Sequence, residues 1–323
     1  MDRTDLRDGP GDSPGDGPRT EFLYCCGAVT EVLKCGPSHL QPEHTVLFLI
    51  IPGNPGLVGF YRTFMQALYG LLGARYPVWA VSHAGHCAPP ESMDMVEDAS
   101  AAVEDVFGLD GQIQHKLTFV RTSVPRGTAL VLVGHSIGCY VILEMMRRSP
   151  ELRVLRAVLL FPTIERMAQT PQGRVMTPVL CQLRYLAYLP VFLLSLLPET
   201  ARAALIRLLF SGIPSLDRSI VQPTVELLSG DCAANSMYLG GQEMRTVLER
   251  DNPTIRKHLD KLLFYYGATD HWCPVKYFQD MKQDFPHGDV RLCEKGFRHA
   301  FVLDSAQQVA KLLVEWIHGA LNT

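Results

Sequence analysis

Short apolar runs recur along the chain and alternate with stretches that have the spacing of amphipathic helices. The apolar runs lie at Thr45–Ile51, Tyr76–Ser82, 128–134, Arg156–Pro162, Lys261–Gly267 and Asp289–Lys295. Their length and composition predict strands, several of them buried on both faces. Helical spacing follows at 58–72, near Gln112–Arg121, and at 137–148, 275–284 and 304–318. This alternation predicts an α/β fold, the α/β-hydrolase type among them, with a mostly parallel sheet flanked by helices.

The alternation is interrupted once, and the chain changes character at its start. Residues 163–260 contain no strand signal and are helical, apolar and interrupted by prolines, so we expect a helical cap or lipid-surface insertion between two late strands. The core then comprises 21–162 and 261–323, and residues 21–36 predict two short strands around a glycine turn. Residues 1–20 are rich in Asp, Gly and Pro, a composition typical of a disordered tail.

Composition narrows the classes of function. The chain has 323 residues, of which 47% are hydrophobic and 20% charged, and its net charge is −3. No basic stripe occurs, which argues against nucleic acid as a partner. Nine cysteines occur without a C-x-x-C pair, so we expect neither a zinc site nor a redox motif, and a reducing compartment fits best. We therefore predict no metal and no cofactor.

A serine stands where one apolar run meets a helix, in the sequence Gly134-His135-Ser136-Ile137-Gly138. The pattern G-x-S-x-G predicts a nucleophile when a strand leads into the serine and a helix follows it, as here. Side chains at the two glycine positions would collide with neighbouring backbone. The alternative is a serine that only caps the following helix.

A serine nucleophile needs a base and an orienting acid, which in this fold follow it on loops after later strands. Asp270 follows the predicted strand at 261–267, and His299 follows the one at 289–295, which makes them the candidate acid and base. His271 precedes the last strand and is a poorer base. Asp304 is an alternative acid, or an acyltransferase signature with His299, but its position favours the N-cap of the last helix.

The reaction also needs donors for an oxyanion. In this fold one is the backbone N–H of the residue after the nucleophile, here Ile137. The second comes from the loop "PGNPG", and we expect it to be the N–H of Asn54, because Gly53 allows a tight turn; the alternative is an ordinary Pro-Gly connection. His83 and His86 have H-x-x-H spacing without a third ligand nearby, which does not favour a metal.

The most apolar segment is 178–211, within the predicted insertion. Its uninterrupted core, Tyr185–Leu197, contains Pro190 and is too short to span a bilayer. Arg184, Arg202 and Arg207 flank it and are placed to meet lipid phosphates. Two interpretations stay open: a helix packed over the substrate pocket, or peripheral docking on a membrane or lipid-droplet surface. Both favour an apolar, acyl-bearing substrate.

With these motifs in hand, the chain resembles the lipid droplet-associated hydrolase family of the α/β-hydrolase superfamily. The resemblance rests on "FLIIPGNPG", "YPVWAVSHAGH", "LVGHSIG", "LLFPTIERM", "YLGGQEM", "FYYGATDHWCP" and "RLCEKGFRHAF". It implies a serine esterase or lipase-like enzyme, of the cholesterol esterase kind, acting on lipids such as sterol esters. It also implies residence on lipid droplets and endoplasmic reticulum, and it carries over to Ser136, Asp270 and His299 as nucleophile, acid and base.

We therefore expect a serine hydrolase of sterol-ester or acylglycerol-like lipid esters at the cytosolic face of droplets and endoplasmic reticulum. Two alternatives remain from the residues alone. One is a droplet-binding scaffold protein with little turnover, because an intact triad does not guarantee a useful rate. The other is an acyltransferase that uses the same serine and passes the acyl group to a lipid alcohol.

Overall fold

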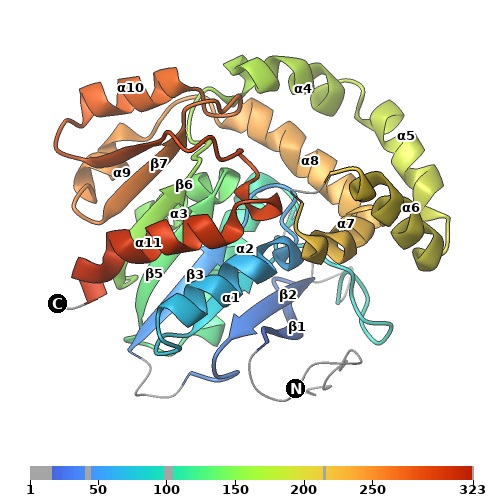
Figure 1. The fold of residues 1–323 in the computed structure, drawn as a ribbon, viewed down its shortest axis with the longest axis horizontal. Helices are drawn as coiled ribbons and strands as arrows, with labels where there is room; N and C mark the ends of the chain where they lie inside the picture. The colour runs from blue at the N-terminus through green and yellow to red at the C-terminus, as the bar shows by residue number, and fades with distance from the viewer. Residues whose placement is uncertain (1–16, 41–44, 98–104, 214–215, 322–323) are drawn as a thin grey trace.

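The structure is a computed structural model that describes residues 17–40, 45–97, 105–213 and 216–321. The predicted tail lies outside these residues as far as position 16, and the first strand begins at Arg19. The ends of the chain and the order of the elements can be followed in Figure 1.

The described residues form one sheet of eight strands in the order β1-β2-β4-β3-β5-β6-β7-β8. The first two strands form an antiparallel hairpin, and β2 also pairs antiparallel with β4, whereas all remaining neighbours are parallel. The strands are β1 (Arg19–Cys25), β2 (Ala28–Cys35), β3 (Val46–Ile51), β4 (Val78–Val81), β5 (Ala129–His135), β6 (Val154–Leu160), β7 (Leu262–Gly267) and β8 (Asp289–Cys293).

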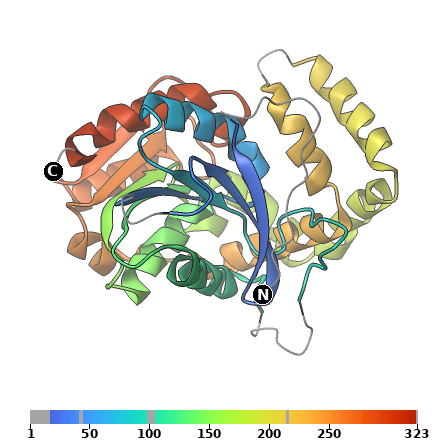
Figure 2. The same ribbon diagram turned by 90° about the horizontal axis from the view of Figure 1, so that it is seen from below.

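Helices cover both faces of this sheet, which is why β5 and β7 are buried along their whole length. Helices α1 (Arg62–Leu71) and α11 (Ala306–Leu321) pack side by side on one face, and α2 (Leu109–Ser123) and α3 (Ile137–Arg148) lie on the other (Figures 1 and 2). Helix α10 (Val275–Asp284) joins β7 to β8, and the short helices η1 (Val58–Tyr61) and η4 (Phe301–Leu303) precede α1 and α11. The predicted α/β fold with a mostly parallel sheet is confirmed.

Only helices occur among the described residues between β6 and β7, as the sequence predicts for the insertion (residues 163–260). They are η2 (Met167–Gln169), α4 (Pro171–Cys181), α5 (Arg184–Ser195), α6 (Glu199–Ser211), η3 (Arg218–Ile220), α7 (Val221–Leu227), α8 (Gly230–Thr246) and α9 (Asn252–Lys257). In Figure 2 the helices α5 and α6 stand to one side of the sheet and its covering helices.

The longest of these helices, α8, lies over the carboxyl ends of the parallel strands. The side-chain amide of Asn235 donates to the carbonyl of Gly85, in the loop after β4, at 3.1 Å. The amide of Asn54, in the loop after β3, donates to the carbonyl of Ser236 at 2.9 Å. The insertion is therefore in direct contact with the edge of the sheet where the predicted site residues lie.

Candidate active site

Ser136 stands at the turn between β5 and α3 in a backbone conformation that L-residues rarely adopt, with φ 54° and ψ −122°. Its backbone is held on both sides: Ser136 N donates to the Leu160 carbonyl at 3.0 Å, and its own carbonyl accepts from Cys139 N at 3.0 Å. The hydroxyl makes no capping hydrogen bond to α3. Ser136 therefore stands at the N-cap position of α3 without capping the helix through its side chain.

The two glycines of the motif are required by close packing, as the sequence predicts. A Cβ on Gly138 would lie 2.2 Å from the carbonyl oxygen of Ile51, and one on Gly134 would lie 2.9 Å from Cys139 N. Both contacts are to backbone, which cannot turn aside as a flexible side chain would. The absence of side chains at these positions lets α3 start directly against β3 and β5.

The structure brings Ser136, His299 and Asp270 into one hydrogen-bonded chain. His299 Nδ1 lies 2.7 Å from Asp270 Oδ2, and His299 Nε2 lies 2.9 Å from Ser136 Oγ. The carboxylate only accepts, so a neutral His299 donates from Nδ1 and presents Nε2 as the acceptor of the serine proton. Asp270 comes from the loop after β7 and His299 from the loop after β8, the positions at which the sequence predicts them.

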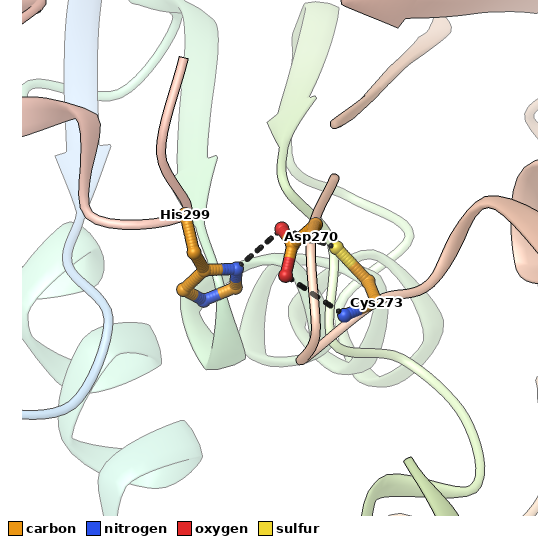
Figure 3. A group of neighbouring side chains, drawn as sticks. All are labelled: Asp270, Cys273 and His299. Atoms are coloured by element: carbon orange, nitrogen blue, oxygen red, sulfur yellow. Dashed lines mark hydrogen bonds and ion pairs between the residues drawn. The ribbon is translucent and has the colours of Figure 1, made fainter. Parts of the chain in front are cut away.

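Asp270 is buried and accepts several hydrogen bonds, of which those from Cys273 and His299 are drawn in Figure 3. Its Oδ1 accepts from the backbone N–H of Trp272 at 2.7 Å and of Cys273 at 3.2 Å, and Oδ2 also accepts from Cys273 Sγ at 3.0 Å. Burial by itself raises the pKa of Asp270, but the charge and hydrogen bond of His299, with the donors of Cys273 and Trp272, outweigh burial and hold that pKa below its ordinary value. The carboxylate is therefore ionised and correctly placed to orient the imidazole.

The same group of residues is the one place in the described chain where three potential metal ligands converge. The ligand atoms of Asp270, Cys273 and His299 all lie within 4.8 Å of one another. Hydrogen bonds among the three account for that proximity. Cys273 belongs to no sequence motif, and its thiol becomes a donor to Asp270 only through the fold.

The loop "PGNPG" lies directly against the serine. A Cβ on Gly53 would lie 3.0 Å from Ser136 Cβ, so Asn54 follows at the edge of the site. Within the described residues, no hydrogen bond is donated by the backbone N–H of Asn54 or of Ile137. Ile137 is the first residue of α3, where an N–H has no acceptor inside its own helix. Neither N–H is used by another group of the described residues, and their role as oxyanion donors stays a prediction.

A second histidine connects this loop to His299. His135 Nε2 lies 2.8 Å from the His299 carbonyl, His135 Nδ1 lies 2.7 Å from the Tyr61 hydroxyl, and Gly53 N donates to that hydroxyl at 2.8 Å. Burial, with the nearby charge of His299, lowers the pKa of His135 to about 3. A neutral His135 must donate from Nε2 to the carbonyl, so Tyr61 donates to Nδ1. In the sequence His135 is marked only as part of the motif around Ser136; its bridging role depends on Tyr61, which no motif marks.

The competing residues lie elsewhere. Asp304 binds Arg298, with Oδ2 at 3.2 Å from Nε, and not His299. Helix α11 begins at Ala306, so the residue directly before it is Ser305, and the prediction that Asp304 is the N-cap is wrong by one position. His271 is exposed on the loop that carries Asp270.

His83 and His86 are buried, with their ring centroids 5.5 Å apart. Among the described residues no third metal-ligating side chain completes a cluster with them.

The chain is similar to known proteins over nearly its whole length. A family model described as lipid-droplet associated hydrolase matches residues 44–302. The lipid droplet-associated hydrolase of Gallus gallus is 56% identical over 309 residues, which cover 94% of this chain and 95% of that protein. The protein of the same name in Homo sapiens is 48% identical over 313 residues, with 94% and 95% covered.

Solved structures share the fold at low sequence identity. A haloalkane dehalogenase from Bradyrhizobium elkani superposes with a TM-score of 0.66 at 12% identity, covering 94% of this chain and 99% of that one. An aryl esterase from Burkholderia cenocepacia, described as putative, superposes with a TM-score of 0.59 at 18% identity, covering 94% and 100%. With the sheet order above, these likenesses show the α/β-hydrolase fold that the sequence predicts.

Proposed function

The chain belongs to the lipid droplet-associated hydrolase family of the α/β-hydrolase superfamily, and on that premise we propose that it is a serine ester hydrolase of lipid esters. The substrate class we propose is sterol-ester or acylglycerol-like, reached at the cytosolic face of lipid droplets and endoplasmic reticulum. The observation that carries the proposal is the chain of hydrogen bonds from Ser136 through His299 to Asp270, at 2.9 and 2.7 Å.

In the proposed mechanism Ser136 Oγ attacks the ester carbonyl carbon while its proton moves to His299 Nε2. The ionised Asp270 stabilises the resulting imidazolium through Nδ1–H. The N–H groups of Ile137 and Asn54 donate to the tetrahedral oxyanion. The imidazolium then protonates the leaving alcohol, and water, activated by the same histidine, hydrolyses the acyl-enzyme and restores the serine.

The insertion supports the lipid part of the proposal. No residue of α5 is buried, and every large exposed hydrophobic side chain of the described chain except Leu71 and Leu248 lies between Val175 and Ile213. A face this apolar marks an interaction surface. We place the contact with the droplet surface here, within 178–211, as peripheral docking.

No single helix of the described chain is long and apolar enough to cross a membrane. Helices α4 and α5 pass the length and composition test only as a pair, bent by 81° at the break between them.

The three arginines that flank the apolar segment have different surroundings. Arg202 Nη1 donates to the Val225 carbonyl at 3.2 Å and so serves the packing of α6 on α7. Arg184 lies over the rings of Tyr185 and Tyr238, each 5.0 Å from its guanidinium, and Arg207 is exposed. Arg184 and Arg207 remain the cations placed to meet lipid phosphates.

The test is fluorophosphonate labelling combined with hydrolysis of a panel of lipid esters on reconstituted droplets. We expect Ser136→Ala to abolish both, because the oxyanion donors and the base then have no nucleophile to serve. Ser305→Ala, which removes a hydroxyl bonded to Asp304, is the matched control and should keep both labelling and hydrolysis.

Stoichiometric labelling of Ser136→Ala would refute the assignment of Ser136 as the nucleophile. A cellular lipid phenotype rescued equally by wild type and Ser136→Ala would favour the low-turnover scaffold instead, and acyl transfer to a lipid alcohol rather than water would favour an acyltransferase.

A further inference from the structure

A buried carboxyl group of the insertion contacts the loop beside Ser136. Glu243, on α8, is 4% exposed, and its Oε1 accepts from Asn54 Nδ2 at 2.8 Å. The second hydrogen of the same amide goes to the Ser236 carbonyl at 2.9 Å, also on α8. Both donors of the Asn54 side chain are therefore used by one helix of the insertion, although the residues lie far apart in the sequence.

The contact is built for a neutral acid. Burial raises the pKa of Glu243 to about 8, although the Asn54 hydrogen bond opposes that rise, so the group carries a proton at neutral pH. Asn54 Oδ1 is buried and has no hydrogen-bond partner among the described residues. A protonated Glu243 keeps Oε1 as the acceptor for the Asn54 side-chain amide, and the carbonyl oxygen of a glutamine side chain provides the same acceptor.

Helix α8 also packs against the carboxyl end of α4, beside its contact with Asn54. A Cβ on Gly240 would lie 2.9 Å from Leu180 Cδ1, and one on Gly241 would lie 3.1 Å from the Leu180 carbonyl. Arg245 Nη2 donates to the Cys181 carbonyl at 3.1 Å. The carboxyl end of α4, directly before the exposed helix α5, is thus bound to the helix that holds Asn54.

We infer that Glu243 is a positioning residue for the oxyanion: by holding the Asn54 side chain from α8, it sets the place of the Asn54 N–H relative to Ser136. The inference rests on the proposed function, because the backbone N–H of Asn54 has a role only if the enzyme forms an oxyanion during acyl transfer. It adds that the oxyanion site is complete only while α8 is seated, so the insertion takes part in catalysis as well as in docking.

The experiment compares kcat and KM for a short water-soluble p-nitrophenyl ester. Removing one oxyanion donor in other hydrolases costs about 10²–10³ in kcat, and a displaced donor should cost a part of that. We expect Glu243→Leu to lower kcat by about 10–100-fold with KM within about threefold, because ground-state binding does not use the oxyanion. Glu243→Gln, which keeps an uncharged acceptor for the Asn54 side-chain amide, should keep kcat within about threefold of wild type.

Asn54→Ala breaks the same hydrogen bond by removing its other partner. It keeps the backbone N–H of residue 54 but removes the side-chain amide that Glu243 binds. We expect a kcat loss of the same order, and a double variant with Glu243→Leu that is no worse than the more impaired single variant. Gln242→Leu, on the neighbouring position of α8 where the side chain binds the Tyr238 hydroxyl, is the control and should keep wild-type kcat. If Glu243→Leu does not fold, Asn54→Ala alone decides.

Retention of kcat within twofold by Asn54→Ala or by folded Glu243→Leu overturns the inference, as does a loss that lies only in KM. Labelling separates this failure from failure of the proposed function. If Ser136→Ala is no longer labelled while Glu243→Leu retains kcat, the serine hydrolase stands and only the role of Glu243 falls. If Ser136→Ala is still labelled in full, the proposed function falls first.

Discussion

At the scale of single residues, the turn at Ser136 requires that Gly138 have no side chain. Its Cβ position is occupied by backbone, 2.2 Å from the Ile51 carbonyl and 2.6 Å from that of Pro52. We expect Gly138→Ala to lower the free energy of unfolding by about 1–3 kcal/mol, because overpacking against backbone forces α3 and β3 apart. Urea unfolding measures the change. Hydrolysis should fall as well, since Pro52 leads into Gly53 and Asn54.

Gly70→Ala is the matched control for that substitution. Gly70 lies inside α1, and nothing lies within 4 Å of a Cβ added there. Alanine should therefore raise the free energy of unfolding by about 0.5–1 kcal/mol through helix propensity alone. A Gly138→Ala protein as stable as wild type would show that the turn tolerates a side chain and would remove the steric reason for the motif.

The site residues that can be predicted from the sequence are those that lie in a recognisable local pattern. Ser136 lies between a strand and a helix, and Asp270 and His299 each follow a strand, so order along the chain is enough to pair them. Glu243 and Tyr61 have no such mark. Their partners lie on other elements, Asn54 for the first and His135 for the second, and a hydrogen bond between distant segments leaves no periodic trace in either.

At the scale of elements, the exposed face of α5 makes the docking proposal testable. Leu186 and Leu193 are 67% and 57% exposed, and burying a leucine side chain is worth about 1.5–3 kcal/mol. Leu186→Asp with Leu193→Asp should therefore lower the droplet-bound fraction at least about tenfold in a flotation assay. Hydrolysis of a soluble ester should be unchanged, because neither side chain contacts the core.

The control for docking is Leu71→Asp, which places the same charge on a leucine that is 49% exposed at the end of α1. It should float with droplets as wild type does. Equal flotation of the α5 double variant and wild type would contradict docking through 178–211, and the face would then have to be covered by something other than lipid.

The ends of helices and strands are predicted less accurately from the sequence than their existence and type. The apolar run predicts a strand over Tyr76–Ser82, but β4 extends only over Val78–Val81, the length that β2 and β3 pair with. The helical stretch near Gln112–Arg121 extends to Leu109–Ser123 in α2. Composition predicts that these elements exist and what type they are, whereas neighbouring strands and caps decide where each one ends.

At the scale of the whole molecule, the core holds many titratable groups in neutral or nearly neutral form. Burial lowers the pKa of His86 to about 3 and that of Lys116 to about 7, and it raises the pKa of both Glu31 and Glu243 to about 8. Lys116 is 1% exposed, and its ammonium nitrogen contacts the Ser82 carbonyl at 2.7 Å. Near neutral pH the interior therefore carries little unpaired charge, which lowers the cost of burying so many polar groups.

Glu31, on β2, allows a test of whether the core holds carboxyl groups in neutral form. It is distant in the sequence from Ser136, Asp270 and His299. Its pKa is raised to about 8 chiefly by burial and further by Glu226, against the opposing charge of Arg62. The unfolded chain releases this proton near pH 4.5, so between that pH and about 8 the folded state binds more protons. Stability from this group is therefore present at low pH and lost as pH rises, by at most about 1.4 kcal/mol per pH unit.

Glu31→Gln removes that titration. Relative to wild type, its free energy of unfolding should rise steadily between pH 5 and 8, as urea unfolding at a series of pH values would measure. Glu144 is similarly buried but binds Arg147 and Arg148 at 2.6 and 2.8 Å, so Glu144→Gln should destabilise the protein at pH 7.5, where Glu31→Gln stabilises it. A difference between Glu31→Gln and wild type that does not change with pH would mean that Glu31 titrates as a solvated carboxylate and that the core tolerates its charge.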